Sequence, residues 1–187
     1  MMELFRREIF RPVMTLLVPG ATALAPYILI LLASYPPLSA FLDKSPTSVL
    51  VVALLCGVAM GLVIEDIGSC IEKGWDRLLE KKTGKHKSDW EAYLTLTLDN
   101  DSIAMEYMSD ILLSMKFELG FSLALLIAWP GLCWYNWLFD VFSGVAFAIV
   151  SVLLIFPLAV YLLWESFSSA KLLGRTRALL LEKQRSD

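Results

Sequence analysis

Ionisable residues are missing from four long stretches of this 187-residue chain. No Asp, Glu, Lys, Arg or His occurs within residues 12–42, 45–64, 119–139 or 141–164. A helix needs about 20 apolar residues to cross the hydrocarbon of a bilayer, and each stretch reaches that length. The whole chain is 19% charged, whereas about a quarter of the residues of an ordinary soluble domain carry charge. The missing charge excludes such a domain and predicts four membrane-spanning helices.

Cysteine and histidine are also scarce, which argues against a cysteine-based zinc or disulfide site and against a histidine-containing metal site. Cys56, Cys70 and Cys133 fall in different segments and have neither zinc spacing nor the pattern of a disulfide framework. The single histidine, His86, stands in a lysine-rich stretch, and the chain has no Glu-x-x-His pair. A di-iron carboxylate bundle uses such pairs. We therefore expect no metal site and no cofactor.

Motifs for nucleophilic catalysis and phosphate binding are absent as well. The sequence has no G-x-S-x-G, no C-x-x-C and no phosphate-binding loop. The charge-free stretches also lack the ionisable groups that intramembrane enzymes and ion-coupled transporters place near the middle of the bilayer. The net charge of −3 argues against direct nucleic-acid binding. We therefore expect that the protein is not an enzyme. The alternative is a membrane-embedded lipid-modifying enzyme, which would have to use the acidic residues described below.

The apolar residues predict an all-α fold, a polytopic membrane protein that forms a single domain over residues 1–187. The expected transmembrane helices cover about residues 12–33, 48–67, 117–134 and 141–164. An N-terminal signal peptide is the alternative for the first of them. The apolar run continues past any small-residue cleavage point, which favours an uncleaved helix.

Proline residues are expected to disturb two of these helices. Proline removes a backbone donor and clashes with the preceding turn, so Pro19-Gly20 and Pro26 predict a kink or unwound turn in the first helix. Pro36-Pro37 is expected to end that helix. Pro130-Gly131 is expected to bend or end the third.

Between the second and third spans, residues 68–116 are expected to form a cytoplasmic helical insertion. Apolar residues recur at helical spacing beyond the second span, which predicts one long helix that ends near Lys82. Ser88 and Glu91 have the spacing of a capping box and predict a short helix. A further amphipathic helix is expected to start near Ser102 and to run into the third span.

Positive charge is concentrated on one side of the predicted spans. Fifteen of the sixteen Lys and Arg residues fall before the first span, in the insertion or in the tail at residues 165–187. Only Lys44 falls in a loop on the other side. Lys and Arg in short loops stay in the cytoplasm. We therefore expect a multi-pass protein with its N-terminus, insertion and C-terminus in the cytoplasm.

Gly57 and Gly61 have the G-x-x-x-G spacing that lets two helix backbones approach closely. Glu65 follows on the same helical face. The spacing predicts helix packing or oligomerisation. It leaves open whether the opposing helix belongs to the same chain or to a second copy.

Acidic residues gather where the second span is expected to leave the membrane. This cytoplasmic membrane-exit face consists of Glu65, Asp66, Glu72 and Asp76. Charged groups beside a membrane are often functional, but a solvated face paired with nearby lysines has the same composition. Lys116 is the candidate partner for Glu65 and for Glu118, the acidic residue nearest the third span.

The insertion also has aromatic residues suited to a protein interface. Trp75, Trp90 and Tyr93 are the candidate docking residues. The same side chains suit the core of a cytoplasmic helical bundle, so both interpretations stay open. The expected partners are the lipid bilayer, a second copy of the chain and a cytoplasmic protein.

Three sequence segments carry a resemblance. Gly61-Leu-Val-Ile-Glu-Asp-Ile-Gly68, Asp89-Trp-Glu-Ala-Tyr-Leu94 and Lys116-Phe-Glu-Leu119 resemble a family of uncharacterised bacterial inner-membrane proteins. In architecture alone, the chain is similar to small four-span membrane subunits of bacterial anti-phage systems such as Kiwa. The resemblance implies the bacterial inner (plasma) membrane, oligomeric assembly and a cytoplasmic partner, but it covers only the middle third of the chain and implies no activity.

Two functions follow as hypotheses. The first is a homo-oligomeric, channel-like or membrane-perturbing effector or sensor that docks a soluble partner, with a place in antiviral defence. The second is a membrane anchor or scaffold subunit with no pore.

Overall fold

The described part of the chain, residues 13–83 and 102–186 of a computed structural model, consists of helices joined by short links. In chain order these are η1 (Val13–Leu17, a π-helix), α2 (Val18–Ser34), α3 (Pro36–Lys44), α4 (Pro46–Thr83), α6 (Ser102–Phe139) and α7 (Gly144–Ser186). No strand occurs among these residues, and the all-α prediction is confirmed.

Four helical stretches are long and apolar enough to cross a membrane. They are Val13–Ser34, Pro46–Leu78, Tyr107–Phe139 and Gly144–Thr176. Each contains one of the charge-free stretches or most of it. The prediction of four helices of transmembrane length and composition is confirmed.

The helices α4, α6 and α7 extend beyond the four membrane-length stretches. The helix expected to end near Lys82 ends at Thr83, and the helix expected to start near Ser102 does start there. The short helix expected after Ser88 lies outside the described residues, as do Trp90 and Tyr93. α7 continues as helix through the expected tail to Ser186.

The prolines affect the helices in different ways. Pro36-Pro37 follows the end of α2, as expected, and it also starts α3, because the residues of the first helical turn need no N–H donor. Pro130 does not end α6, which continues to Phe139. In the first span α2 is continuous through Pro26, and the irregular turn is η1, directly before α2.

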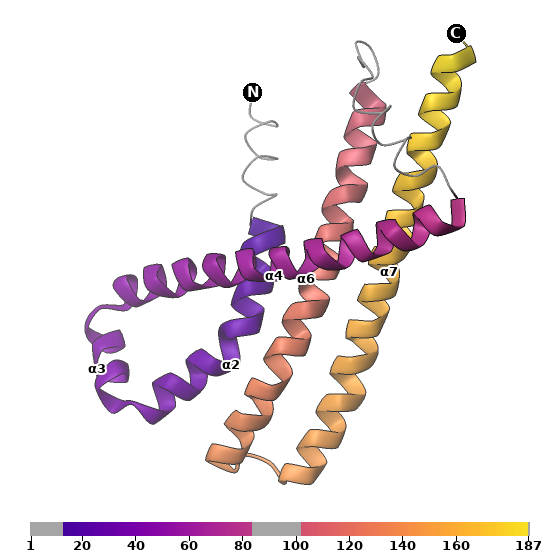
Figure 1. The fold of residues 1–187 in the computed structure, drawn as a ribbon. Helices are drawn as coiled ribbons and strands as arrows, with labels where there is room; N and C mark the ends of the chain where they lie inside the picture. Colours follow the sequence, from indigo (N-terminus) through magenta and orange to yellow (C-terminus); the bar gives the residue numbers. More distant parts are fainter. Residues whose placement is uncertain (1–12, 84–101, 187) are drawn as a thin grey trace.

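The helices α6 and α7 are arranged with their charged halves toward one end of the molecule. In Figure 1, α6 and α7 run side by side in opposite directions, whereas α4 lies across the other helices. The first turn of α6 and the last turn of α7 lie toward the same end, which we call the charged end, whereas α4 crosses both helices part-way along and its last turn lies to one side of them. The α6–α7 turn lies at the opposite end, the turn end.

The buried core lies where α2, α4 and α6 meet. Ala23, Ile64 and Ala124, one from each helix, are completely buried there. Tyr27 of α2 reaches across to α6, where its hydroxyl donates a 2.9 Å hydrogen bond to the carbonyl of Ile127. Two of the three core residues are alanines, so the helices approach closely at this point.

The contact of η1 and α2 with α4 is built on glycine. A Cβ atom added at Gly20 would overlap the carbonyl oxygen of Gly57, and one added at Gly61 would overlap the carbonyl oxygen of Leu16. A Cβ at Gly57 would make ordinary contacts, with the Leu17 side chain at 3.4 Å as its nearest neighbour. The G-x-x-x-G face of α4 therefore packs against the chain's own first helix. Oligomerisation through these glycines stays a prediction, and it would have to displace η1 and α2.

The contact between α6 and α7 is built on hydrogen bonds from side chains. They run from Ser122 Oγ to the Ala159 carbonyl (2.9 Å), from Ser166 Oγ to the Met115 carbonyl (2.9 Å) and from Trp129 Nε1 to Ser151 Oγ (3.1 Å). Ser122 and Ser166 are completely buried. Each hydroxyl thus has a partner in surroundings that offer no water.

Asn136 closes the turn between these two helices. Its Nδ2 donates to the Phe142 carbonyl (3.1 Å), and its Oδ1 accepts from the Phe142 N–H (2.9 Å). Asp140 has a φ of 46°, in the left-handed region, and its N–H donates to the Asn136 carbonyl (2.8 Å). These contacts end α6 and fix the position of the turn.

Candidate functional site

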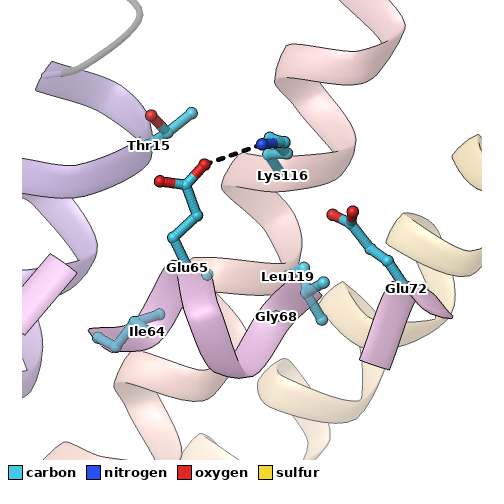
Figure 2. A pocket seen from close by; sticks show the side chains of 8 residues that line it. Thr15, Ile64, Glu65, Gly68, Glu72, Lys116 and Leu119 are labelled. Carbon is cyan, nitrogen blue, oxygen red and sulfur yellow. Dashed lines mark hydrogen bonds and ion pairs between the residues drawn. The ribbon is translucent and has the colours of Figure 1, made fainter. Parts of the chain in front are cut away.

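An ion pair joins the two long helices α4 and α6 at the predicted membrane-exit face. Lys116 Nζ of α6 lies 2.8 Å from Glu65 Oε1 of α4 (Figure 2). The two side chains are 33% and 34% exposed, so the pair is only partly screened by solvent. Of the two carboxylates for which Lys116 was the candidate partner, it therefore pairs with Glu65.

A small pocket lies beside this ion pair. Its lining comes from η1, α4 and α6 and includes Thr15, Ile64, Gly68 and Leu119. Figure 2 shows Thr15 beside the Glu65 carboxylate. The pocket has a volume of about 10 Å³, which holds about one water molecule. It is too small for a substrate or a cofactor.

Lys116 is shared between two carboxylates of α4. Glu72 also lines the pocket, and Figure 2 shows it on the other side of Lys116 from Glu65. Glu72 is within electrostatic reach of Lys116, which attracts it, and of Glu65 and Asp76, which repel it. The lysine thus offsets part of the acidic charge on α4 and holds that helix against α6.

The four predicted exit-face residues therefore divide into two pairs. Glu65 and Glu72 come together at the pocket with Lys116. Asp66 and Asp76 are exposed and do not line it. No group of three or more His, Cys, Asp or Glu suited to a metal ion occurs among residues 13–83 and 102–186.

Glu118 forms a separate contact within α6 and toward α7. Its Oε1 accepts a 2.9 Å hydrogen bond from Ser114 Oγ. Its Oε2 is buried and makes no hydrogen bond of good geometry, although the Ser169 hydroxyl of α7 is close enough to stabilise the carboxylate. Glu165 of α7 is near enough to repel it electrostatically.

Trp75, a predicted docking residue, packs against α7. Its ring lies 5.5 Å from the ring of Phe167, edge to face. On α7, Lys171 Nζ lies 4.3 Å from the centre of the Phe167 ring. Trp75 is half-buried and joins α4 to α7 within one chain. A docking role for it stays a prediction.

Exposed apolar residues on the charged halves of three helices were not singled out from sequence. Leu78 of α4, Tyr107 of α6 and Leu172 of α7 are 57%, 51% and 43% exposed. Each occurs in an amphipathic pattern, and such a pattern does not tell which apolar residues a neighbouring helix leaves uncovered. The sequence signal for exposed apolar contact residues was therefore ambiguous.

No family model, curated protein or solved structure matches this chain. The residue geometry provides side-chain contacts between helices, a pocket for one water molecule and two long helices, α6 and α7, whose charged halves lie toward one end.

Proposed function

We propose that the protein is an integral membrane scaffold that holds a stalk of long helices outside the bilayer for a soluble partner. The observation that carries the proposal is helix length. At 1.5 Å per residue, the 38 residues of α6 extend about 57 Å, and the 43 residues of α7 extend about 65 Å. The hydrocarbon of a bilayer is about 30 Å thick. About half of α6 and of α7 therefore exceeds the length needed to cross it.

The surplus halves of α6 and α7 lie together. α7 has its charge-free stretch in its first half and α6 has its stretch in the second, so their antiparallel packing brings the two charged halves to the charged end, and the charged half of α4 crosses them. Fifteen of the sixteen Lys and Arg residues belong to this side of the spans. The positive-inside rule supports a cytoplasmic location for this end and for both termini.

The stalk also offers a contact surface. The exposed side chains of Leu78, Tyr107 and Leu172 are the apolar groups on this part of the chain that a partner would cover. The Glu65–Lys116 ion pair and the Trp75–Phe167 contact hold α4 to its neighbours here. A partner would thus meet a positioned set of helices.

The test is capture of the partner by the full-length tagged chain after cross-linking in membranes. Tyr107→Ala combined with Leu172→Ala is expected to reduce recovery of the specific partner at least fivefold. The matched control is Val145→Ala combined with Leu153→Ala, which changes two side chains of equal or greater exposure on the charge-free half of α7. Equal recovery with both double variants would overturn the docking surface.

Orientation is tested separately. A single cysteine at position 140, with the three native cysteines replaced, is expected to react with an impermeant maleimide only from the outer side. A cysteine replacing Arg175 is expected to react only from the cytoplasm. Labelling of position 140 from the cytoplasmic side would overturn the proposed topology, whatever the result of the capture experiment.

A homo-oligomeric, channel-like protein is the second candidate, favoured by the apolar surface that one chain leaves uncovered. Leu55 of α4 and Val145 and Leu153 of α7 are 65%, 73% and 66% exposed. In a bilayer such surface contacts lipid or a second copy. A detergent-solubilised oligomer that conducts ions in liposomes would replace the scaffold proposal, whereas a monomer without conductance would remove this candidate.

A further inference from the structure

A second and larger pocket lies at the turn end, between the last turns of α6 and the first turns of α7. Its volume is about 260 Å³, close to the lower limit for small-molecule sites. The wall includes two aromatic side chains, Trp137 and Phe147, one carboxylate, Asp140, and one thiol, Cys133. Unlike the pocket beside Lys116, it has room for several non-hydrogen atoms.

The pocket carries negative charge that no cation of the chain is seen to offset. Asp140 is the only charged residue between Glu118 and Glu165. Within residues 13–83 and 102–186, Asp140 takes part in no ion pair. Its carboxylate is therefore available to a cation from outside the chain.

The carboxamide in the wall, that of Asn136, is already occupied. Both ends of the Asn136 carboxamide bond the backbone of Phe142. A ligand therefore meets aromatic side chains and one carboxylate, on a turn that these hydrogen bonds hold in place. Aromatic faces and a carboxylate attract organic cations, whereas Asp140 repels anions.

We propose that this pocket binds the ammonium group of an organic cation of the ethanolamine or choline type. The carboxylate of Asp140 supplies the opposite charge, and Trp137 and Phe147 supply aromatic contact to the alkyl-ammonium group. The cation is either the headgroup of a phospholipid or a free amine, since both present the same group. The site stands apart from the proposed stalk and does not depend on it.

Cys133 provides a reporter inside the pocket. In the full chain with Cys56→Ala and Cys70→Ala, Cys133 is the remaining thiol, and the rate at which a small maleimide modifies it reports on occupancy. Choline chloride is expected to slow modification at least fivefold at saturation. Its uncharged isostere 3,3-dimethylbutan-1-ol, and sodium chloride at matched ionic strength, are expected to leave the rate within twofold.

Substitution of the carboxylate tests the assigned contact. Asp140→Asn keeps the size of the side chain and tolerates the positive φ. It is expected to raise the choline concentration for half-maximal protection about tenfold. The matched control is Asp43→Asn, which removes an exposed carboxylate from α3, outside the pocket, and is expected to change nothing. If Asp140→Asn loses its helical circular dichroism, Phe147→Leu takes its place, with an expected three- to fivefold effect.

Nanodiscs distinguish the two sources of the cation. If a headgroup is the ligand, Cys133 is protected in phosphatidylcholine or phosphatidylethanolamine discs without added choline, but not in phosphatidylglycerol discs. If a free amine is the ligand, only soluble choline protects. Either result supports the ammonium site. Equal protection by choline and its isostere, or unchanged protection in both pocket variants, would overturn it.

Discussion

Two helix contacts of this molecule, α2 against α4 and α6 against α7, are built from different atoms. At the first, Gly20 and Gly61 bring backbone directly against backbone, so that a single added carbon would overlap a carbonyl oxygen. At the second, hydroxyl and indole groups donate hydrogen bonds across the interface. The first contact requires residues without a side chain at Gly20 and Gly61. The second contact requires polar side chains.

The difference predicts how the two contacts respond to change. Lipid is as apolar as leucine, so helices in a bilayer associate through close packing and through interhelical hydrogen bonds. Close packing fails when one methyl group no longer fits. A hydrogen bond within a membrane is worth about 0.6 kcal/mol on average, so the loss of any one is tolerated.

The largest effect is expected for Gly20→Ala. Its new methyl group would overlap the carbonyl oxygen of Gly57, so α2 and α4 would have to separate. We expect a loss of about 3 kcal/mol, at the upper end for overpacking. Unfolding in mixed micelles, followed by circular dichroism, measures it. The control is Gly57→Ala, whose Cβ would find its nearest neighbour at 3.4 Å, and equal losses in the two variants would contradict the glycine-based contact.

A smaller effect is expected for Lys116→Met, which keeps the length of the stem but removes the charge. Glu65 then loses its ion-pair partner. Because both groups are about one-third exposed, we expect a loss of about 1 kcal/mol that shrinks at high salt. Combining it with Glu65→Gln should cost less than the sum of the single changes. Additive losses would show that the pair contributes nothing.

For Gly74→Ala we expect a gain in stability instead of a loss. A Cβ at Gly74 would meet nothing within 4 Å. Alanine is the better helix former, so we expect a gain of about 0.8 kcal/mol in the same unfolding measurement. A loss at Gly74 would mean that every glycine of α4 matters, rather than those that face η1 and α2.

The smallest effect is expected for Ser166→Ala. The change removes one hydrogen bond to the Met115 carbonyl of α6 but adds no atom. We expect a loss of about 0.6 kcal/mol, and a similar loss for Ser122→Ala. A loss as large as that of Gly20→Ala would remove the distinction between the two contacts.

The sequence was sufficient to predict the helices, because missing charge over a span length is a strong signal and a helical period is visible beyond it. It was not sufficient to predict which helices meet. The Gly57 and Gly61 spacing defines a face of α4, but the opposing Leu16 and Gly20 follow only from the fold. Lys116 had two candidate partners at similar depth, and only the crossing of α4 over α6 brings Glu65 to it.

The buried serines show the same limit. A lone hydroxyl in an apolar helix can bond a carbonyl one turn back in its own helix, as Thr22 does to Val18 at 2.8 Å. Ser122 and Ser166 instead bond the neighbouring helix. Nothing in the local sequence distinguishes the two outcomes, because the choice depends on how closely the neighbouring backbone approaches.

The glycine contact fixes α4 at one point and leaves a long segment beyond it. From Gly61, which we take as the pivot of a rotation, the 22 residues to Thr83 extend about 33 Å. A rotation of about 10° at the pivot displaces the far end by about 6 Å, at 1.5 Å of arm per residue. Such a rotation would strain the Glu65–Lys116 ion pair, one turn from Gly61, and the Trp75–Phe167 contact further along the helix. The length of α4 would thus turn a small change at the glycine contact into a larger displacement at Thr83.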